Sequence, residues 1–141
     1  MNHLNNLLIE GVLVMDPETI ALAKESKSKL VKFSIASDRI YIDKEGIKQK
    51  DTLFLPVLVW GSLADMCLSH LSKGITVRLV GRLKMNRWET TAGEKRTSIE
   101  LIAQHVEYKK YTNKKKEETV VMEEKEGESD TLSESIVLYR I

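Results

Sequence analysis

Apolar and polar residues alternate along most of the first 110 positions, the pattern of β-strands that bury one face. The alternation predicts five strands, over residues 4–14, 30–41, 51–60, 75–88 and 95–108. Asp16-Pro17 ends the first strand, residues 43–46 form a turn inside a longer hydrophilic loop, and residues 91–94 form a hairpin tip. Gly11 marks a bulge or a sharp bend in the first strand, where a small barrel must curve.

One segment, residues 62–73, has helical spacing instead. Ser62 and Asp65 have the spacing of a capping box, and Gly74 provides a left-handed end. Its apolar stripe consists of Leu63, Cys67 and Leu71. Five strands with one helix between the third and the fourth are the element order of an OB-fold, so we expect an all-β, five-stranded barrel.

Two of the expected strands place aromatic and basic side chains on one face. In residues 51–60 the odd positions are aliphatic, and Phe54 and Trp60 share the even face. In residues 75–88 the even face carries Arg78, Arg82, Lys84 and Trp88. Cations beside aromatic rings are typical of a surface that binds an extended polyanion such as a nucleic acid.

Charge is unevenly distributed along the chain. The 141 residues suffice for one compact domain, and the net charge is only +1. However, residues 109–116 hold five lysines and no acid, whereas residues 117–135 hold seven glutamates and one aspartate against one lysine. Such blocks are typical of solvated tails. We therefore expect an OB-fold nucleic-acid-binding domain over residues 1–110 and a disordered charged tail over residues 111–141.

The sequence contains no recognisable motif for catalysis, phosphate binding or metal binding. Cys67 is the only cysteine, so no internal disulfide can form, and no His or Cys lies at a metal-ligand spacing from it. No apolar run approaches the roughly 18 residues of a membrane span, and the N-terminus lacks a signal peptide. We therefore expect a protein without enzyme activity, cofactor, metal or membrane contact, in the cytoplasm with the nucleoid.

Nine short motifs in a specific order and spacing are distributed over residues 4–107. They are residues 4–11, 16–18, 33–36, 60–64 (Trp-Gly-Ser-Leu-Ala), 71–74, 80–83 (Val-Gly-Arg-Leu), 87–89, 93–96 and 103–107. Each motif alone is weak, but together they resemble the bacterial single-stranded DNA-binding proteins of the replicative, homotetrameric type. The resemblance implies a homotetramer that wraps single-stranded DNA with little sequence preference and protects it during replication, recombination and repair.

The resemblance also implies site residues. The family stacks bases on four aromatic positions, and this chain is aromatic at all four: Tyr41, Phe54, Trp60 and Trp88. The family cations that contact phosphates correspond to Lys44, Lys73, Lys84, Arg87 and Arg96. A further position that is often lysine is Ser62 here.

The C-terminal end departs from the family. Its members usually end in an acidic stretch closed by an Asp-rich tip with Pro-Phe, which docks on replication and repair enzymes. This chain has the acidic stretch but ends in the apolar residues 136–141. These residues could dock on a different partner, add a strand to an exposed edge or pack on their own barrel, so partner recruitment through the tail stays open.

The residues also allow plainer interpretations. Phe54 and Trp60 could be core residues, but aliphatic side chains already fill the other face of their strand, and a narrow barrel has little room for a second set. Tyr41 could cap a sheet edge, and Arg78 could serve a subunit contact. At the level of function, the alternatives are a scaffold that recruits proteins and binds DNA weakly, and an accessory domain that delivers RNA to an enzyme.

Overall fold

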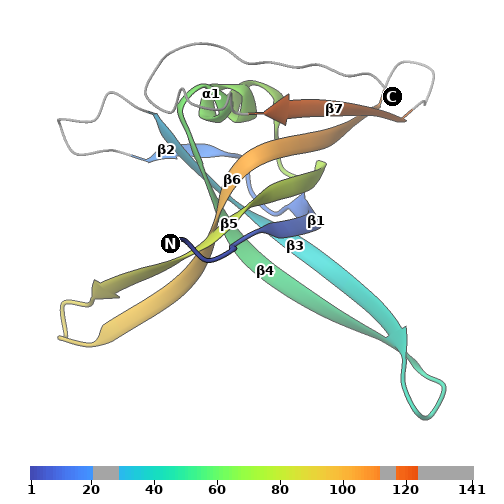
Figure 1. Cartoon of the computed structure of the whole chain (residues 1–141). Coiled ribbons are helices and arrows are strands. Elements are labelled where there is room, and N and C mark those ends of the chain that lie inside the picture. The colour runs from blue at the N-terminus through green and yellow to red at the C-terminus, as the bar shows by residue number, and fades with distance from the viewer. Residues whose placement is uncertain (21–28, 112–116, 124–141) are drawn as a thin grey trace.

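The structure is a computed structural model of the chain, and it describes residues 1–20, 29–111 and 117–123 (Figure 1). The elements are β1 (Leu7–Leu13), β2 (Glu18–Ile20), β3 (Leu30–Ile42), β4 (Lys48–Trp60), α1 (Gly61–His70), β5 (Thr76–Glu89), β6 (Lys95–Tyr111) and β7 (Glu117–Glu123). All the strands belong to one strongly bent sheet.

Five of the strands close into a barrel. They follow the order β1-β5-β6-β4-β3, and β1 also pairs with β3 through Val12 and Leu13, which completes the circle. The neighbours β4 and β6 are parallel and pair over two residues each, Val57 with Leu101 and Leu58 with Ile102. Helix α1 lies between the third and fourth barrel strands in sequence. The predicted OB-fold with its five-stranded barrel is confirmed.

The side chains that alternate inward fill the barrel. Phe33, Ile35, Val57, Leu79 and Leu101 are fully buried, and each lies at an apolar position of an alternating strand. The predicted stripe of α1 is buried against the same core. Burial of these apolar side chains is the main favourable contribution to the stability of a barrel of this size.

Two glycines allow strands to approach closely. A Cβ atom on Gly11 would lie 2.7 Å from the carbonyl oxygen of Ala36, and one on Gly81 would lie 2.0 Å from that of Ile102. The register of β5 with β6 shifts between Val80 and Gly81, which is where the ladder contains its bulge. Gly11 thus marks a close approach of β1 to β3, and the bulge lies in a different strand pair.

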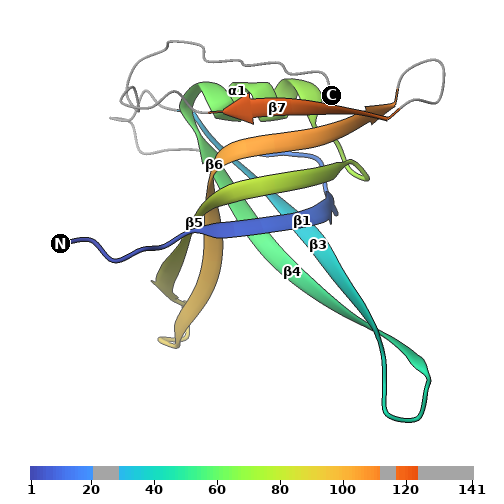
Figure 2. The same cartoon turned by 45° about the vertical axis from the view of Figure 1, so that its right-hand side comes forward.

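Two hairpins extend beyond the barrel as arms. The β3–β4 arm and the β5–β6 arm diverge from the barrel in both views (Figures 1 and 2). The β3–β4 arm ends in a tight turn instead of the expected longer loop, since its strands pair as far as Ile42 and Lys48. Hydrogen bonds from the Gln49 side chain and the Ile47 amide hold the pKa of the Asp43 carboxyl in this turn below its usual value.

The predicted capping of α1 is wrong at both ends. The helix begins at Gly61, so Ser62 lies inside its first turn, and no side chain caps it. Asp65 instead pairs with Lys29, at 2.8 Å between Nζ and Oδ1. The helix ends before Leu71, which is extended, and the left-handed Gly74 comes three residues later, with φ of 93°.

The expected disorder of the tail is wrong for residues 117–123. These residues form β7, which pairs antiparallel with the end of β6. Val120 and Met122 are buried in the barrel core, so this segment contributes to the fold. The alternation of the sequence did not predict β2 either, which is only three residues long. The remaining tail residues, 112–116 and 124–141, lie outside the described residues. Among the described residues, no helix is long and apolar enough to span a membrane.

Candidate nucleic-acid interface

The outer face of β4, β6 and β5 carries the predicted aromatic and basic residues. These three strands lie side by side with β6 in the middle. Pairing of Leu58 with Ile102 and of Ile102 with Arg82 puts the even positions of all three strands on the same side of the sheet. We call this surface the aromatic face. Its members are Phe54, Leu58 and Trp60 on β4, Arg96, Ser98, Glu100 and Ile102 on β6, and Arg82, Lys84 and Trp88 on β5.

The three aromatic side chains of this face differ in exposure. Phe54 is 65% exposed and Trp88 is 44% exposed, although large aromatic side chains are usually buried. Trp60 is partly buried because it packs on a small cluster formed by Leu30, Leu58 and Ile102. The plainer interpretation as a core residue is therefore wrong for Phe54, whereas Trp60 combines packing with partial exposure.

Two of the predicted phosphate-binding cations share the aromatic face. Lys84 is exposed and lies opposite Glu100 on β6. Arg96 lies directly opposite Trp88 in the hairpin ladder, and its guanidinium is 3.1 Å from the Glu94 carboxylate. Both ions of that pair are largely exposed, so the pair is weak and Arg96 remains available to an anionic ligand.

Four predicted site residues lie elsewhere. Tyr41 pairs with Gln49, on the opposite face of the β3–β4 arm from Phe54, and the Arg39 guanidinium lies 4.9 Å from its ring centroid. Arg87 has odd parity, and its Nε contacts the Met85 sulfur on the other face of β5. The other two are Lys44, in the turn at the tip of the β3–β4 arm, and Lys73, in the connection after α1. Both lysines are exposed.

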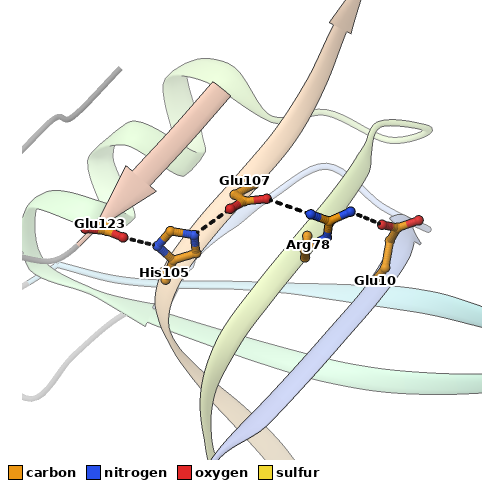
Figure 3. Close-up of polar contacts among 5 residues, drawn as sticks. All are labelled: Glu10, Arg78, His105, Glu107 and Glu123. Carbon is orange, nitrogen blue, oxygen red and sulfur yellow. Dashed lines mark hydrogen bonds and ion pairs between the residues drawn. The ribbon is translucent and has the colours of Figure 1, made fainter. Parts of the chain in front are cut away.

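Arg78 does not offer a free cation. Its guanidinium is 3.2 Å from Glu10 on β1 and 3.3 Å from Glu107 on β6 (Figure 3). The row continues through His105, whose Nε2 lies 3.0 Å from Glu107 and whose Nδ1 contacts Glu123 on β7. These side chains link four neighbouring strands. Arg78 thus stabilises the sheet instead of joining the predicted basic face, because it finds carboxylates on both neighbouring strands.

Two charged residues of this surface were not predicted from the sequence. Lys32 on β3 lies opposite Leu58, and Glu100 on β6 lies opposite Lys84. Lys32 could have been found, because even positions of β3 pair with even positions of β4 and so lie on the same face as Phe54. Glu100 could not, because its burial depends on the neighbouring strands β4 and β5. No group of three or more His, Cys, Asp and Glu residues in the described segments could hold a metal ion.

Comparison with known proteins places this geometry in a family. The model of the Single-strand binding protein family matches residues 4–109, most of the chain. The chain belongs to this family. Within the family, it is 35% identical over 141 residues to the single-stranded DNA-binding protein of Thermotoga maritima, with 95% of this chain and 96% of that protein aligned. It is 30% identical over 131 residues to single-stranded DNA-binding protein 2 of Chlorobaculum tepidum, covering 93% of this chain and 86% of the relative.

The fold also matches that of a solved structure. The structure described as a Plasmodium falciparum SSB complex with single-stranded DNA superposes with a TM-score of 0.65 and 22% sequence identity. The superposition covers 72% of this chain and 88% of the other. At this identity the likeness establishes the shared fold.

Proposed function

We propose that this protein, without catalysing a reaction, binds single-stranded DNA with little sequence specificity. In the proposed mechanism, bases stack on the aromatic side chains, and phosphates are tracked by the cations beside them. The observation that carries the proposal is the exposure of Phe54 and Trp88 on the face that also holds Lys84 and Arg96. Every base has a π-face, so stacking tolerates any sequence and contributes roughly 1–3 kcal/mol per base. The names of the family and of the bacterial relatives support the same ligand.

The four predicted residues outside the aromatic face fit a longer DNA path. Tyr41 and Lys44 lie on the β3–β4 arm, and Arg87 lies on the reverse side of the β5–β6 arm. We propose that the strand leaves the aromatic face and winds around the arms, where Tyr41 stacks with a base. Lys44, Lys73 and Arg87 would contact phosphates along that path.

A substitution pair on neighbouring residues tests the stacking part of the proposal. Phe54→Ala should weaken binding of oligo-dT by about 1–3 kcal/mol, because one stacked base loses its partner. Leu53→Ala is the matched control, since Leu53 is 55% exposed on the opposite face of the same strand. It should bind like the wild type. Equal affinities of both variants and the wild type, measured by titration of intrinsic tryptophan fluorescence, would remove the stacking mechanism.

The salt dependence of binding tests the electrostatic part. Each phosphate contact releases condensed counterions, so the logarithm of the affinity should fall with the logarithm of the salt concentration by about 0.7 per contact. Lys84→Glu should make this slope shallower. Lys110→Glu, at the far end of β6, changes the net charge equally and should leave the slope nearly unchanged. A salt-independent affinity of the wild-type protein contradicts phosphate tracking.

The cellular role follows from this activity as a further part of the proposal. A protein that covers single strands without reading their sequence suits the protection of DNA during replication, recombination and repair. Recruitment of replication and repair proteins would fall to the C-terminal tail, which lies largely outside the described residues. Competition between oligo-dT and oligo-U separates this role from the alternative of RNA delivery, because an RNA carrier would prefer the 2′-hydroxyl.

A further inference from the structure

Two isoleucines lie exposed on one side of the β3–β4 arm. Ile40 is 59% exposed and Ile42 is 72% exposed, although isoleucine is among the residues most often buried in proteins. Both occupy even positions of β3, and even positions of β3 pair with even positions of β4. They therefore lie on the same side of the arm as Phe54, so this side continues the aromatic face away from the barrel.

Each of these isoleucines has a lysine as its cross-strand neighbour. Ile40 lies opposite Lys50, and Ile42 lies opposite Lys48. Both lysines are exposed. The Lys50 ammonium is 3.5 Å from the Asp38 carboxylate, but both ions are largely exposed and the pair is weak. Lys48 makes no ion pair within the described residues. Two consecutive rows of the arm thus hold one apolar and one cationic side chain each.

The spacing of the two rows suits an extended single strand. Two residues along a β-strand rise about 7 Å, which is close to the length of one nucleotide in an extended strand. A nucleotide combines an apolar base face with one phosphate, the two groups that each row complements. A second copy of the same surface fits less well, because its lysines would lie close to those of the first copy.

We propose that the rows Ile40–Lys50 and Ile42–Lys48 are two further nucleotide subsites, where a base lies on the isoleucine and a phosphate contacts the lysine. The strand then continues from Phe54 along this side of the arm towards its tip. Contact with a base face tolerates any sequence, because every base has such a face. The proposal rests on the proposed function, since the strand must first occupy the aromatic face.

NMR of the isoleucine methyl groups in the full-length protein tests the contact directly. Saturating oligo-dT should move the δ1 methyl signals of Ile40 and Ile42 upfield, because the ring current of a stacked base shields a methyl group beneath it. Ile35, which is fully buried in the barrel, is the internal control and should keep its position. Unmoved signals of the two exposed isoleucines, while tryptophan fluorescence reports bound DNA, overturn the proposal. Absence of any binding contradicts the proposed function instead.

A series of oligo-dT lengths separates these subsites from the aromatic face. Ile40→Ala combined with Ile42→Ala should bind a long oligo-dT about tenfold more weakly, because two apolar contacts are lost. The double variant should bind the shortest oligo-dT that the wild type retains with unchanged affinity, which also shows that it is folded. Leu53→Ala is the matched control, since Leu53 is 55% exposed on the reverse side of β4. It should bind both lengths like the wild type.

Three results of this series overturn the proposal. The first is an unchanged affinity of the double variant at every length. The second is an equal loss at all lengths, because the two residues then act on the fold or on the aromatic face. The third is a smaller assembly of the double variant in light scattering, which would assign the isoleucines to a contact between copies.

The salt dependence tests the lysines. Lys48→Gln combined with Lys50→Gln should make the salt slope for long oligo-dT shallower by about 0.7 per lost phosphate contact. The slope for the shortest oligo-dT should stay unchanged. Lys110→Gln, at the far end of β6, is the control and should keep the wild-type slope at both lengths. An unchanged slope of the double variant for long oligo-dT overturns the phosphate contacts and with them the two subsites.

Discussion

Trp60 and Trp88 are both expected to stack on bases, but their surroundings differ. Trp60 packs on the cluster of Leu30, Leu58 and Ile102, whereas Trp88 stands 44% exposed near the end of the β5–β6 arm. A substitution at Trp60 therefore affects the fold and the ligand together. A substitution at Trp88 should affect the ligand alone.

The first prediction is a split between these two residues. Trp88→Ala should weaken oligo-dT binding by about 1–3 kcal/mol and leave the free energy of unfolding nearly unchanged. Trp60→Ala should weaken binding and also destabilise the fold by about 1–2 kcal/mol, because a partly buried side chain leaves its cluster. Urea unfolding followed by circular dichroism measures the stability, and a competition assay measures the binding. Equal stability of the two variants would contradict the packing role of Trp60.

Cys67 predicts how stability changes in alkali. Burial raises the pKa of its thiol from 9.0 to about 12. The stabilisation of the neutral thiol is complete below pH 9 and is lost as the pH rises from about 9 towards 12, because the unfolded chain ionises first. At pH 10 the loss should be about 1.4 kcal/mol.

Cys67→Ala provides the control for this pH dependence. The variant is less stable at every pH, since it leaves a cavity, but it should lose less stability between pH 8 and pH 10 than the wild type. Burial also raises the pKa of the Tyr108 hydroxyl, which both proteins retain. Identical pH profiles of the two proteins in urea unfolding would show that the thiol does not contribute.

At the scale of elements, β7 is a strand that the sequence did not predict, and it pairs with the end of β6. It lies in a stretch whose Glu-rich composition suggested a solvated tail, yet Val120 and Met122 alternate inward within it. The net negative charge of residues 117–135 concealed a short apolar run of only three residues, 120–122. The composition of a long window was therefore a poor guide to this strand.

The third prediction follows from the burial of β7. Met122→Ala should lower the free energy of unfolding by about 2–4 kcal/mol, the range for a large side chain removed from a packed core. Thr119→Ala, on the same strand and only half-buried, should cost less than about 1 kcal/mol. If Met122→Ala melts at the wild-type temperature, β7 does not belong to the cooperative fold.

At the scale of the whole molecule, β1 leaves a sheet edge open. It pairs with β5 along Leu7 to Val12 but with β3 only at Val12 and Leu13. The second edge of residues 7–11 therefore has no strand partner among the described residues, and Leu8 beside it is exposed. Open edges of this kind pair with other chains unless they are protected.

The fourth prediction is self-association through this edge, with four copies as the family resemblance suggests. Light scattering at micromolar concentration should report a tetramer, and Leu8→Lys should shift it towards smaller species. Ile40→Lys changes a similarly exposed apolar residue on the β3–β4 arm and should leave the assembly intact. A monomeric wild-type protein would contradict the prediction.

The sequence predicted the barrel well because strand alternation and turn residues act locally. It also predicted which side of β4 and β5 would hold Phe54, Lys84 and Trp88. It could not predict that Arg78 would lie between Glu10 and Glu107, because those partners come from other strands. The environment of Glu100 depends likewise on the order of β4, β6 and β5, which the alternation within one strand does not encode. The roles of the predicted site residues in DNA binding stay predictions.

The parallel pairing of β4 with β6 spans only two residues on each strand, and it closes the barrel beneath the aromatic face. A closure this short should open more often than the long antiparallel ladders, so its amide protons should exchange with solvent sooner. The cluster that contains Trp60 straddles the same junction through Leu58 and Ile102. A DNA strand that binds across the β4–β6 junction would stabilise this part of the barrel. In the bound protein these amide protons should exchange more slowly and the melting temperature should rise, because the bound DNA then contributes to the stability of the barrel.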